Sequence, residues 1–381
     1  MQVLFFKWNS FLNEGILQAF EKLGITYTVF DYDFTDWEKD ERFLELFRRA
    51  LGKTEADVVL SVNYSPLIAQ VCSDLQTNYM AWIYDSPIHI RRKEELYYPT
   101  THLFCFDRGQ ALAYARQGIW AKHLPLAASP ELFLREAITP ADREVYTSEI
   151  SFVGQLYKTE YPYYMGPLEE YQRGFLEGII HAQGKVYGAY FLPELITDDF
   201  LKEMNVRYAL ASKGTAEIKR EELEYMLACE VTSRERYLIL ALLSNHFQVR
   251  HYASEKEERL SKLEYMGYAD YQKEMPKIFQ LSKINLNISL KTIQTGIPLR
   301  ALDIMACGGF LISNYQEELA EYFRIGEELV TYTDVEELVY LCDYFLREEE
   351  QRKRIAIAGQ KRVKEAFSFE RALQQILSVG E

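Results

Sequence analysis

The sequence predicts an α/β protein with two Rossmann-like domains, and three observations support this prediction. Short apolar runs alternate with helical stretches, which is typical of parallel sheets covered by helices on both faces. This series occurs twice, beginning at Val3 and again at Ile150, with a polar stretch between. The chain of 381 residues is also long enough for two domains that each bury a core.

The first series, over 1–135, is expected to form the N-terminal domain. Its first helix can end at Gly24, because glycine readily adopts the left-handed conformation of a helix C-terminus. Asp36 is expected to cap the next helix, over 37–51, and Gly52 to end it. Further strands are predicted over 57–62, 78–84, 102–106 and 122–126.

A polar linker over 136–149 leads to the second series, over 150–365, which is expected to form the C-terminal domain. Residues from about 158 to 245 interrupt this series, because they are rich in tyrosine and then helical in pattern. We interpret them as a helical insertion, which is either scaffold or part of an acceptor site. The last residues, 366–381, are predicted to contain an amphipathic helix.

The composition, with 48% apolar and 26% charged residues, is that of an ordinary soluble protein. A net charge of −14 argues against a broad nucleic-acid surface or an electrostatic membrane anchor. The five cysteines are dispersed without zinc or redox spacing, so free thiols in a reducing cytoplasm are expected. With no secretory leader and no membrane-spanning apolar run, we expect a cytoplasmic protein without an integral membrane segment.

The most informative stretch lies between residues 281 and 323. A strand and a polar loop lead to Pro298, which suits the first turn of a short helix. Such a helix start offers free N–H groups and the positive end of the dipole to a phosphate. Arg300 adds a forked cation that suits a diphosphate, and Asp303, one turn later, could accept hydrogen bonds from ribose hydroxyls. The alternative is that Arg300 and Asp303 only pair with each other.

The run from Asp303 to Gly308 resembles the Glu-Ala-Met-Ala-x-Gly helix of GT-B glycosyltransferases, in which the acid binds the ribose of the donor. The longer segment 282–309 is similar to the bacterial CgeB-like (spore maturation protein) glycosyltransferase family. The resemblance covers nearly the whole chain and is most specific in the C-terminal half. It departs from the family at 294–296, where Gln-Thr-Gly stands in the region of the usual first acid of the GT-B pair.

The resemblance implies two domains that face each other across a cleft, with the donor on the second domain and the acceptor on the first. It also implies that the C-terminal helix crosses back to the first domain. The helix start at 297–299, with Arg300 and Lys291, would stabilise a leaving diphosphate, so no metal is expected. The expected donor-binding residues are Gly154, Tyr157, Tyr271, Asn287, Lys291, Gly296, Ile297, Pro298, Arg300 and Asp303.

Some of these residues also have a plainer interpretation. Gly154 directly follows the first strand of the second series, where glycine lets a phosphate or sugar approach the backbone or simply ends the strand. Tyr271 could stack on the nucleotide base, or it could be a packed surface tyrosine.

The candidate catalytic residues are Asp85 and His89, which follow a predicted central strand. In parallel sheets ligands bind beyond the carboxyl ends of the strands. Either side chain could be a general base toward an acceptor hydroxyl or could stabilise charge on the transferring sugar. The alternative is a capped turn before Pro87 and a solvated histidine. The other loops at this predicted edge are 8–10, 63–66 and 107–109.

We therefore expect a hexosyltransferase-like, metal-independent glycosyltransferase. It would move a sugar from a nucleotide-diphosphate sugar to a hydroxyl acceptor, which family analogy suggests is a surface glycan or glycoprotein. No cofactor and no nucleic-acid partner are expected. A sugar-nucleotide epimerase of the same fold and a non-catalytic sugar-nucleotide-binding partner are the alternatives.

Overall fold

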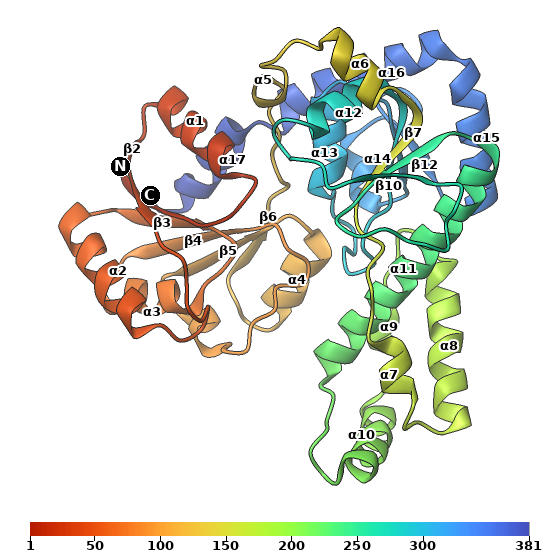
Figure 1. Cartoon of the computed structure of the whole chain (residues 1–381). Helices are drawn as coiled ribbons and strands as arrows, with labels where there is room; N and C mark the ends of the chain where they lie inside the picture. Colours follow the sequence, from red (N-terminus) through yellow and green to blue (C-terminus); the bar gives the residue numbers. More distant parts are fainter. Residues whose placement is uncertain (381) are drawn as a thin grey trace. The chain divides into compact units, whose positions relative to one another are not determined.

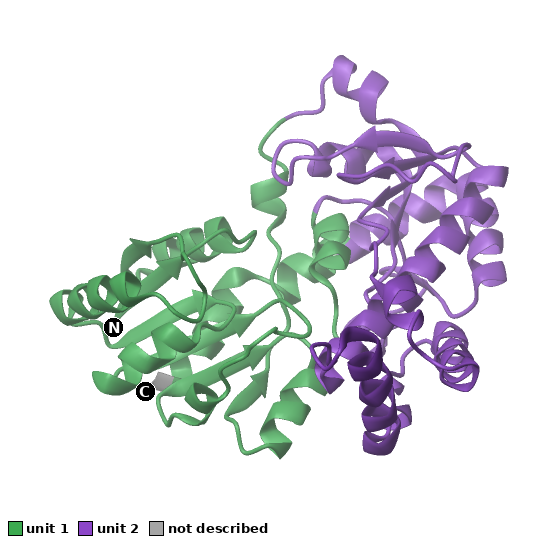
Figure 2. Cartoon of the chain, turned by 60° about the horizontal axis from the view of Figure 1, so that its bottom comes forward, with its two compact units in different colours: residues 1–136, 295–306, 360–381 green, residues 137–294, 307–359 purple. Residues whose placement is uncertain are grey.

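The computed structural model describes residues 1–380, which divide into two compact units (Figure 2). Unit 1 comprises residues 1–136, 295–306 and 360 onward, and unit 2 comprises 137–294 and 307–359. The chain therefore passes from one unit to the other at four points along the sequence. The predicted domain limits, which were continuous stretches, stay predictions.

Unit 1 is built on a parallel six-stranded sheet in the order β2-β1-β3-β4-β5-β6 (Figure 1). Its strands are β1 (Gln2–Lys7), β2 (Thr26–Asp31), β3 (Val58–Val62), β4 (Asn78–Ile83), β5 (Thr101–Cys105) and β6 (Ala121–His123). Every residue of β3 and β5 is buried, as expected when helices cover both faces of a parallel sheet. The carboxyl ends of these strands meet at one edge, which brings the loops that follow them together.

Helices α1 and α17 cover one face of this sheet, and α2, α3 and α4 cover the other (Figure 1). The helices of the unit are α1 (Asn13–Leu23), α2 (Glu41–Thr54), α3 (Pro66–Asp74), η1 (Glu94–Tyr97), α4 (Arg108–Arg116), α5 (Pro130–Phe133), α13 (Leu299–Ala306), α17 (Phe369–Leu377) and η2 (Ser378–Gly380). The ring of Phe369 lies directly over Gly15, since an added Cβ there would come within 2.2 Å of the ring. This contact fixes α17 on α1.

The ends of the first two helices test the predicted caps. Gly24 ends α1 with a φ of 65°, as predicted. The prediction for α2 was wrong, because the helix begins after Asp40, whose carboxylate accepts the N–H of Phe43. The same carboxylate also accepts the N–H of Thr35, so the intervening residues form a loop around it. Gly52 lies inside the helix, which ends before the left-handed Glu55.

Unit 2 contains a second parallel six-stranded sheet in the order β12-β11-β10-β7-β8-β9. Its strands are β7 (Ser148–Val153), β8 (Val249–Tyr252), β9 (Glu264–Gly267), β10 (Ser282–Asn287), β11 (Leu311–Asn314) and β12 (Val330–Tyr332). Its helices are α6 (Pro140–Tyr146), α7 (Tyr161–Met165), α8 (Glu170–Gly184), α9 (Leu192–Leu195), α10 (Asp198–Ser212), α11 (Arg220–His246), α12 (Met275–Leu281), α14 (Glu317–Tyr322), α15 (Val335–Arg347) and α16 (Glu349–Ala366), whose last turns belong to unit 1.

Helices α7 to α11 form the predicted insertion, and they have a core of their own. Leu176, Met204 and Leu227, from three of these helices, are fully buried in one apolar cluster. A separate cluster holds the sheet of the unit together, with Ile150, Ile284 and Ile312 at its centre. The predicted fold class, two Rossmann-like α/β sheets with a helical insertion, is confirmed.

Candidate functional site

The loops after β3 and β4 are joined by Asn63. Its side-chain oxygen accepts the N–H groups of Tyr84 and Asp85 at 3.0 and 3.3 Å. Its amide nitrogen donates to the Asp85 carboxylate, with 2.6 Å between Nδ2 and Oδ2. Asp85, a predicted catalytic residue, is therefore held at the carboxyl end of β4 by a residue that follows β3.

The surroundings of Asp85 favour its protonated form. Desolvation raises the pKa of this carboxyl above its usual range, more than the Asn63 hydrogen bond and the charge of His89 lower it. More than a third of the residue is nevertheless exposed, as is His89. Asp85 thus combines solvent access with a raised pKa, as a proton acceptor near neutral pH requires.

The loop before α13 lies against the loop after β5. Thr295 donates to the Asp107 carboxylate through its backbone N–H and its hydroxyl, at 3.3 and 3.2 Å. The same oxygen of Asp107 accepts the N–H of Gly109 and so caps α4. An added Cβ at Gly296 would lie 2.9 Å from the Asp107 Cα, which is too close for a real contact. A side chain at Gly296 would therefore force the Asp107 backbone to shift, at the position directly before the buried Ile297 and Pro298.

Arg300 and Asp303 lie on the same face of α13. Their side chains pair, with 3.3 Å between Nη1 and Oδ2. Asp303 is 2% exposed, whereas Arg300 remains 24% exposed. The structure thus shows the pairing that was one of the two interpretations of these residues, and their predicted roles in donor binding stay predictions.

In unit 2, the loop after β7 is held at Gly154. The N–H of Gly154 donates to Tyr252 O at 3.1 Å, and its carbonyl lies 2.8 Å from Nε2 of His251. The His251 ring is fully buried and stacks on Phe152. Burial, reinforced by the charge of Arg236, lowers the pKa of His251, so the imidazole is neutral and donates its Nε2 proton to Gly154.

Arg236 of α11 connects this loop to the loop after β10. Its guanidinium donates from Nη1 to the carbonyl of Gln155. It also donates to the carbonyl of Ile288, from Nη2 and from Nε, the latter at 3.2 Å. It also lies over the rings of Phe152 and Tyr157, 5.2 and 4.9 Å from their centroids. Arg236 is 8% exposed and forms no ion pair with a carboxylate of residues 1–380. A buried cation without a contacting anion therefore lies beneath two loops that were predicted to bind the donor.

Sequence reasoning missed Arg236, although a signal exists. It lies on the buried face of α11, one turn before Ile239 and Leu240 and two turns before Leu243, which are all buried. A lone arginine on such a face needs polar partners inside the protein.

Two residues predicted to bind the sugar donor, Asn287 and Lys291, lie near Ile288 and already have partners within the protein. Lys291 forms a buried ion pair with Glu235, 3.0 Å from Nζ to Oε2, and lies 4.3 Å from the centroid of the Tyr187 ring. Asn287 donates to the hydroxyls of Ser289 and Ser313 at 3.1 and 2.9 Å. Their roles in donor binding stay predictions, as does that of the half-buried Tyr271 in the turn before α12.

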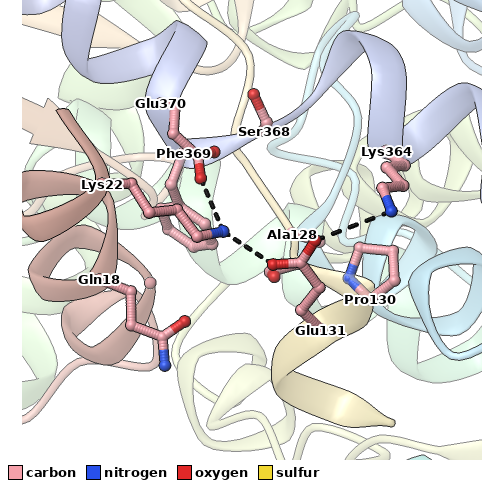
Figure 3. Close-up of a pocket in the computed structure, with 11 residues that line it drawn as sticks. Gln18, Lys22, Ala128, Pro130, Glu131, Lys364, Ser368, Phe369 and Glu370 are labelled. Atoms are coloured by element: carbon pink, nitrogen blue, oxygen red, sulfur yellow. Dashed lines mark hydrogen bonds and ion pairs between the residues drawn. The ribbon is translucent and has the colours of Figure 1, made fainter.

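A cavity of about 260 Å³ lies in unit 1 (Figure 3), and none of the predicted site residues lines it. It is lined by α1, α5, Lys364 near the end of α16 and the start of α17. Lys22 pairs there with Glu131 at 2.7 Å and with Glu370 at 2.9 Å. Because each charge already has a partner, this cavity is not a strong candidate for a ligand site.

Residues 1–380 contain no cluster of three histidine, cysteine or acidic side chains placed to hold a metal ion. In the same range, no helix has the length and apolar character needed to cross a membrane.

Comparison with known proteins identifies the fold. Residues 234–378 match a family model described as glycosyl transferase-like. This segment begins two residues before Arg236 and includes Lys291, Arg300 and Asp303. No curated protein matches the chain in sequence.

Solved glycosyltransferases match the chain over its whole length. Sucrose-phosphate synthase from Thermosynechococcus elongatus has a TM-score of 0.57 at 10% identity and covers 100% of this chain and 98% of its own. A glycosyltransferase from Rickettsia africae has a TM-score of 0.56 at 10% identity, with coverage of 100% and 97%. Anabaena HepE in complex with UDP and glucose has a TM-score of 0.51 at 12% identity, with coverage of 100% and 99%. At these identities the likeness establishes the fold, which is that of GT-B glycosyltransferases.

Proposed function

We propose that this chain is a glycosyltransferase that moves a sugar from a nucleotide-diphosphate sugar to a hydroxyl group of an acceptor. The observation that carries the proposal is the overlap of three features in one segment. The glycosyl transferase-like match covers residues 234–378, and this segment contains both Arg300 at the start of α13 and the Ile288 carbonyl that Arg236 holds. Cations near a helix N-terminus suit a diphosphate leaving group.

In this proposal the donor contacts are those predicted from the sequence. Arg300 and the backbone of 297–299 bind the diphosphate, and Asp303 exchanges its pairing with Arg300 for the ribose hydroxyls. Lys291 and Asn287 contribute from the loop after β10, and Gly154 allows the donor to approach the backbone after β7. Asp85 and His89 act on the acceptor side.

Donor binding is tested first by thermal shift with UDP, GDP, dTDP and CMP and with their sugar conjugates. A ligand at a hundredfold excess over its Kd should stabilise the protein by about 2.7 kcal/mol. UDP is the first nucleotide to try, because HepE was solved with it. Arg300→Ala and Asp303→Ala should abolish the shift. Unchanged binding in both variants, or no shift with any nucleotide, would contradict the donor site.

Transfer is tested by measuring nucleotide release with and without an acceptor. A transferase releases nucleoside diphosphate much faster when the acceptor is present. Conversion of the donor sugar without release would instead indicate an epimerase, and binding without either reaction would indicate a non-catalytic partner. We further propose that the enzyme is CgeB-like and cytoplasmic, that its acceptor is a surface glycan or glycoprotein, and that EDTA leaves its rate unchanged.

A further inference from the structure

We propose that Asn63 is a positioning residue that fixes the Asp85 carboxylate for the hydroxyl group of the acceptor. This inference rests on the proposed glycosyltransferase function, and it adds a residue that the predicted site does not contain. All the groups involved lie in unit 1, at the carboxyl ends of β3 and β4.

The backbone of Asn63 is held in an unusual conformation. Its φ is 57°, in the left-handed region that asparagine tolerates better than most residues. Its N–H donates to Trp82 O at 2.8 Å, and its carbonyl accepts the hydroxyl of Ser61 at 2.6 Å. The residue is 4% exposed, so these contacts are shielded from water.

Two indole rings fix the carbonyl groups on either side of Asn63. Trp8 donates from Nε1 to Val62 O at 2.6 Å, and Trp37 donates from Nε1 to Tyr64 O at 3.2 Å. The rings contact each other, with 5.0 Å between their centroids. Residues that precede and follow β2 therefore hold the turn at Asn63 in place.

The side chain of Asn63 uses this fixed backbone to orient Asp85. Its oxygen accepts two successive N–H groups, of Tyr84 and Asp85, and its nitrogen donates to Oδ2 of Asp85. The other carboxylate oxygen, Oδ1, accepts no hydrogen bond from residues 1–380. One oxygen of Asp85 is thus anchored while the second is available to a hydroxyl.

An amide suits this task better than a cation would. Arginine or lysine in the place of Asn63 would orient the carboxylate but would also lower its pKa and weaken it as a base. The titratable groups that affect Asp85 are the neighbouring His89, which lowers its pKa, and Tyr84, whose own pKa is raised to about 12. Asn63 therefore supplies orientation without neutralising the charge.

The chemistry is a balanced displacement. The acceptor O–H bond breaks, and the acceptor oxygen forms a bond to the anomeric carbon of the donor sugar. The bond from that carbon to the diphosphate oxygen breaks, and the nucleoside diphosphate leaves with the electron pair. Asp85 takes the proton through Oδ1 and later releases it to water.

The test compares Asn63→Gly with Glu55→Gly. Glycine accepts the left-handed backbone at both positions, and Glu55, at φ 47°, precedes β3 whereas Asn63 follows it, so the two residues lie at opposite ends of that strand. Asn63→Gly should lower kcat about 100-fold, as misplaced catalytic groups do, without changing the KM for the donor. The acid limb of its pH–kcat profile should move to higher pH, because Asp85 loses the hydrogen bond that stabilises its ionised form. Glu55→Gly should match the parent.

A second variant and a second measurement separate the outcomes. Asn63→Asp keeps the size and backbone tolerance of asparagine but places a like charge beside Asp85, so it should move the acid limb further than Asn63→Gly does. Carboxyl titration by NMR of ¹³C-aspartate-labelled protein, with Asp85→Asn to assign the signal, needs no activity. If the parent transfers no sugar, the proposed function fails, but a higher Asp85 pKa in Asn63→Gly still supports positioning. An unchanged titration, or an unchanged kcat and pH profile, overturns it.

Discussion

In each unit a buried side chain joins the loops that follow two neighbouring strands, but the chemistry of the two side chains differs. In unit 1, a neutral amide, Asn63, joins the loops after β3 and β4 and binds the Asp85 carboxylate. In unit 2, a buried guanidinium, Arg236, joins the loops after β7 and β10 and binds two backbone carbonyls. Both bridges lie at the carboxyl ends of neighbouring parallel strands, where such sheets bind ligands.

The difference follows from what each loop must do in the proposed reaction. A carboxylate that accepts a proton must keep its basicity, so a neutral donor suits it. A diphosphate is attracted by positive potential, and a buried cation without a contacting anion supplies that potential over a longer range than an exposed one. Two loops are therefore joined by a neutral side chain in unit 1 and by a positively charged one in unit 2.

The largest expected effect tests the bridge in unit 2. Arg236→Met removes the donors to Gln155 O and Ile288 O and should lower the free energy of unfolding by about 3 kcal/mol, because buried carbonyls are left unsatisfied. It should also weaken nucleotide binding. Arg352→Met is the matched control, since Arg352 is equally buried and donates to Phe345 O. Urea unfolding and thermal shift with UDP would check both. If Arg236→Met bound UDP as tightly as the parent, the proposed role of the Arg236 charge in attracting a diphosphate would be contradicted.

The next effect concerns the loop before α13. Gly296→Ala places a Cβ against the Asp107 backbone and should cost about 2 kcal/mol, as overpacked sites do. Gly52→Ala inside α2, where no atom lies within 4 Å of the added Cβ, should instead stabilise by about 0.5–1 kcal/mol. Chemical denaturation of the two variants beside the parent measures both signs. Equal stability of Gly296→Ala and the parent would contradict the close contact.

Acid should weaken the His251 contact in unit 2. Burial lowers the pKa of His251 in the folded state below the unfolded value of about 6.5. The contribution of the neutral ring to folding stability is therefore fully present above about pH 6.5, and it is lost as the pH falls through the folded pKa. His251→Gln, which can still donate to Gly154 O, should lose less stability than the parent between pH 8 and pH 5. The exposed His246→Gln is the control. Parallel losses in parent and His251→Gln would contradict this account.

The Asp85 carboxyl in unit 1 should respond in the opposite direction. Its pKa is raised in the folded state, so its contribution to stability is present at low pH and is lost as the pH rises through the folded pKa. Asp85→Asn should therefore gain melting temperature relative to the parent on going from pH 4 to pH 8, while losing transfer activity about 100-fold or more. A constant difference in melting temperature across this range would contradict the raised pKa.

The smallest effect belongs to the Lys22 ion pairs. These side chains are 28–54% exposed, so Lys22→Met should lower stability by about 0–1 kcal/mol. Raising the salt concentration from 0.05 to about 1 M should remove most of this difference, because salt screens exposed charges. Lys353→Met in α16, which loses an exposed pair with Glu349, should behave in the same way. A loss that persists at high salt would indicate packing of the lysine stem instead.

The sequence predicted those features whose causes are local. Gly24 ends α1 because its left-handed conformation is decided within one turn. The short helix predicted after Pro298 and the amphipathic helix at the end of the chain are both present, as α13 and α17. Proline in the first turn indicates the first of them, and the period of apolar residues indicates the second. The cap of α2 was misplaced because Asp36 and Asp40 are both capping residues, and only the tertiary contacts of Asp40 distinguish them.

The bridges could not be predicted because their partners are distant in sequence. Asn63 lies 22 residues from Asp85, and Arg236 lies 52 residues from Ile288. Strand order and register bring these residues together, and periodicity specifies neither. The sequence predicted that the loop at Asn63 lies at the functional edge. The hydrogen bond from Asn63 to the Asp85 carboxylate, however, could be identified only from the structure.

The contact between Phe369 and Gly15 also has a consequence for synthesis on the ribosome. The sheet of unit 1 is complete by residue 123, yet the helix that covers α1 is made more than two hundred residues later. At about 5–20 residues per second, that interval lasts on the order of ten to fifty seconds. Unit 2 is translated within it. The nascent N-terminal sheet must therefore wait, with the α1 surface uncovered, until the last helix has left the ribosome.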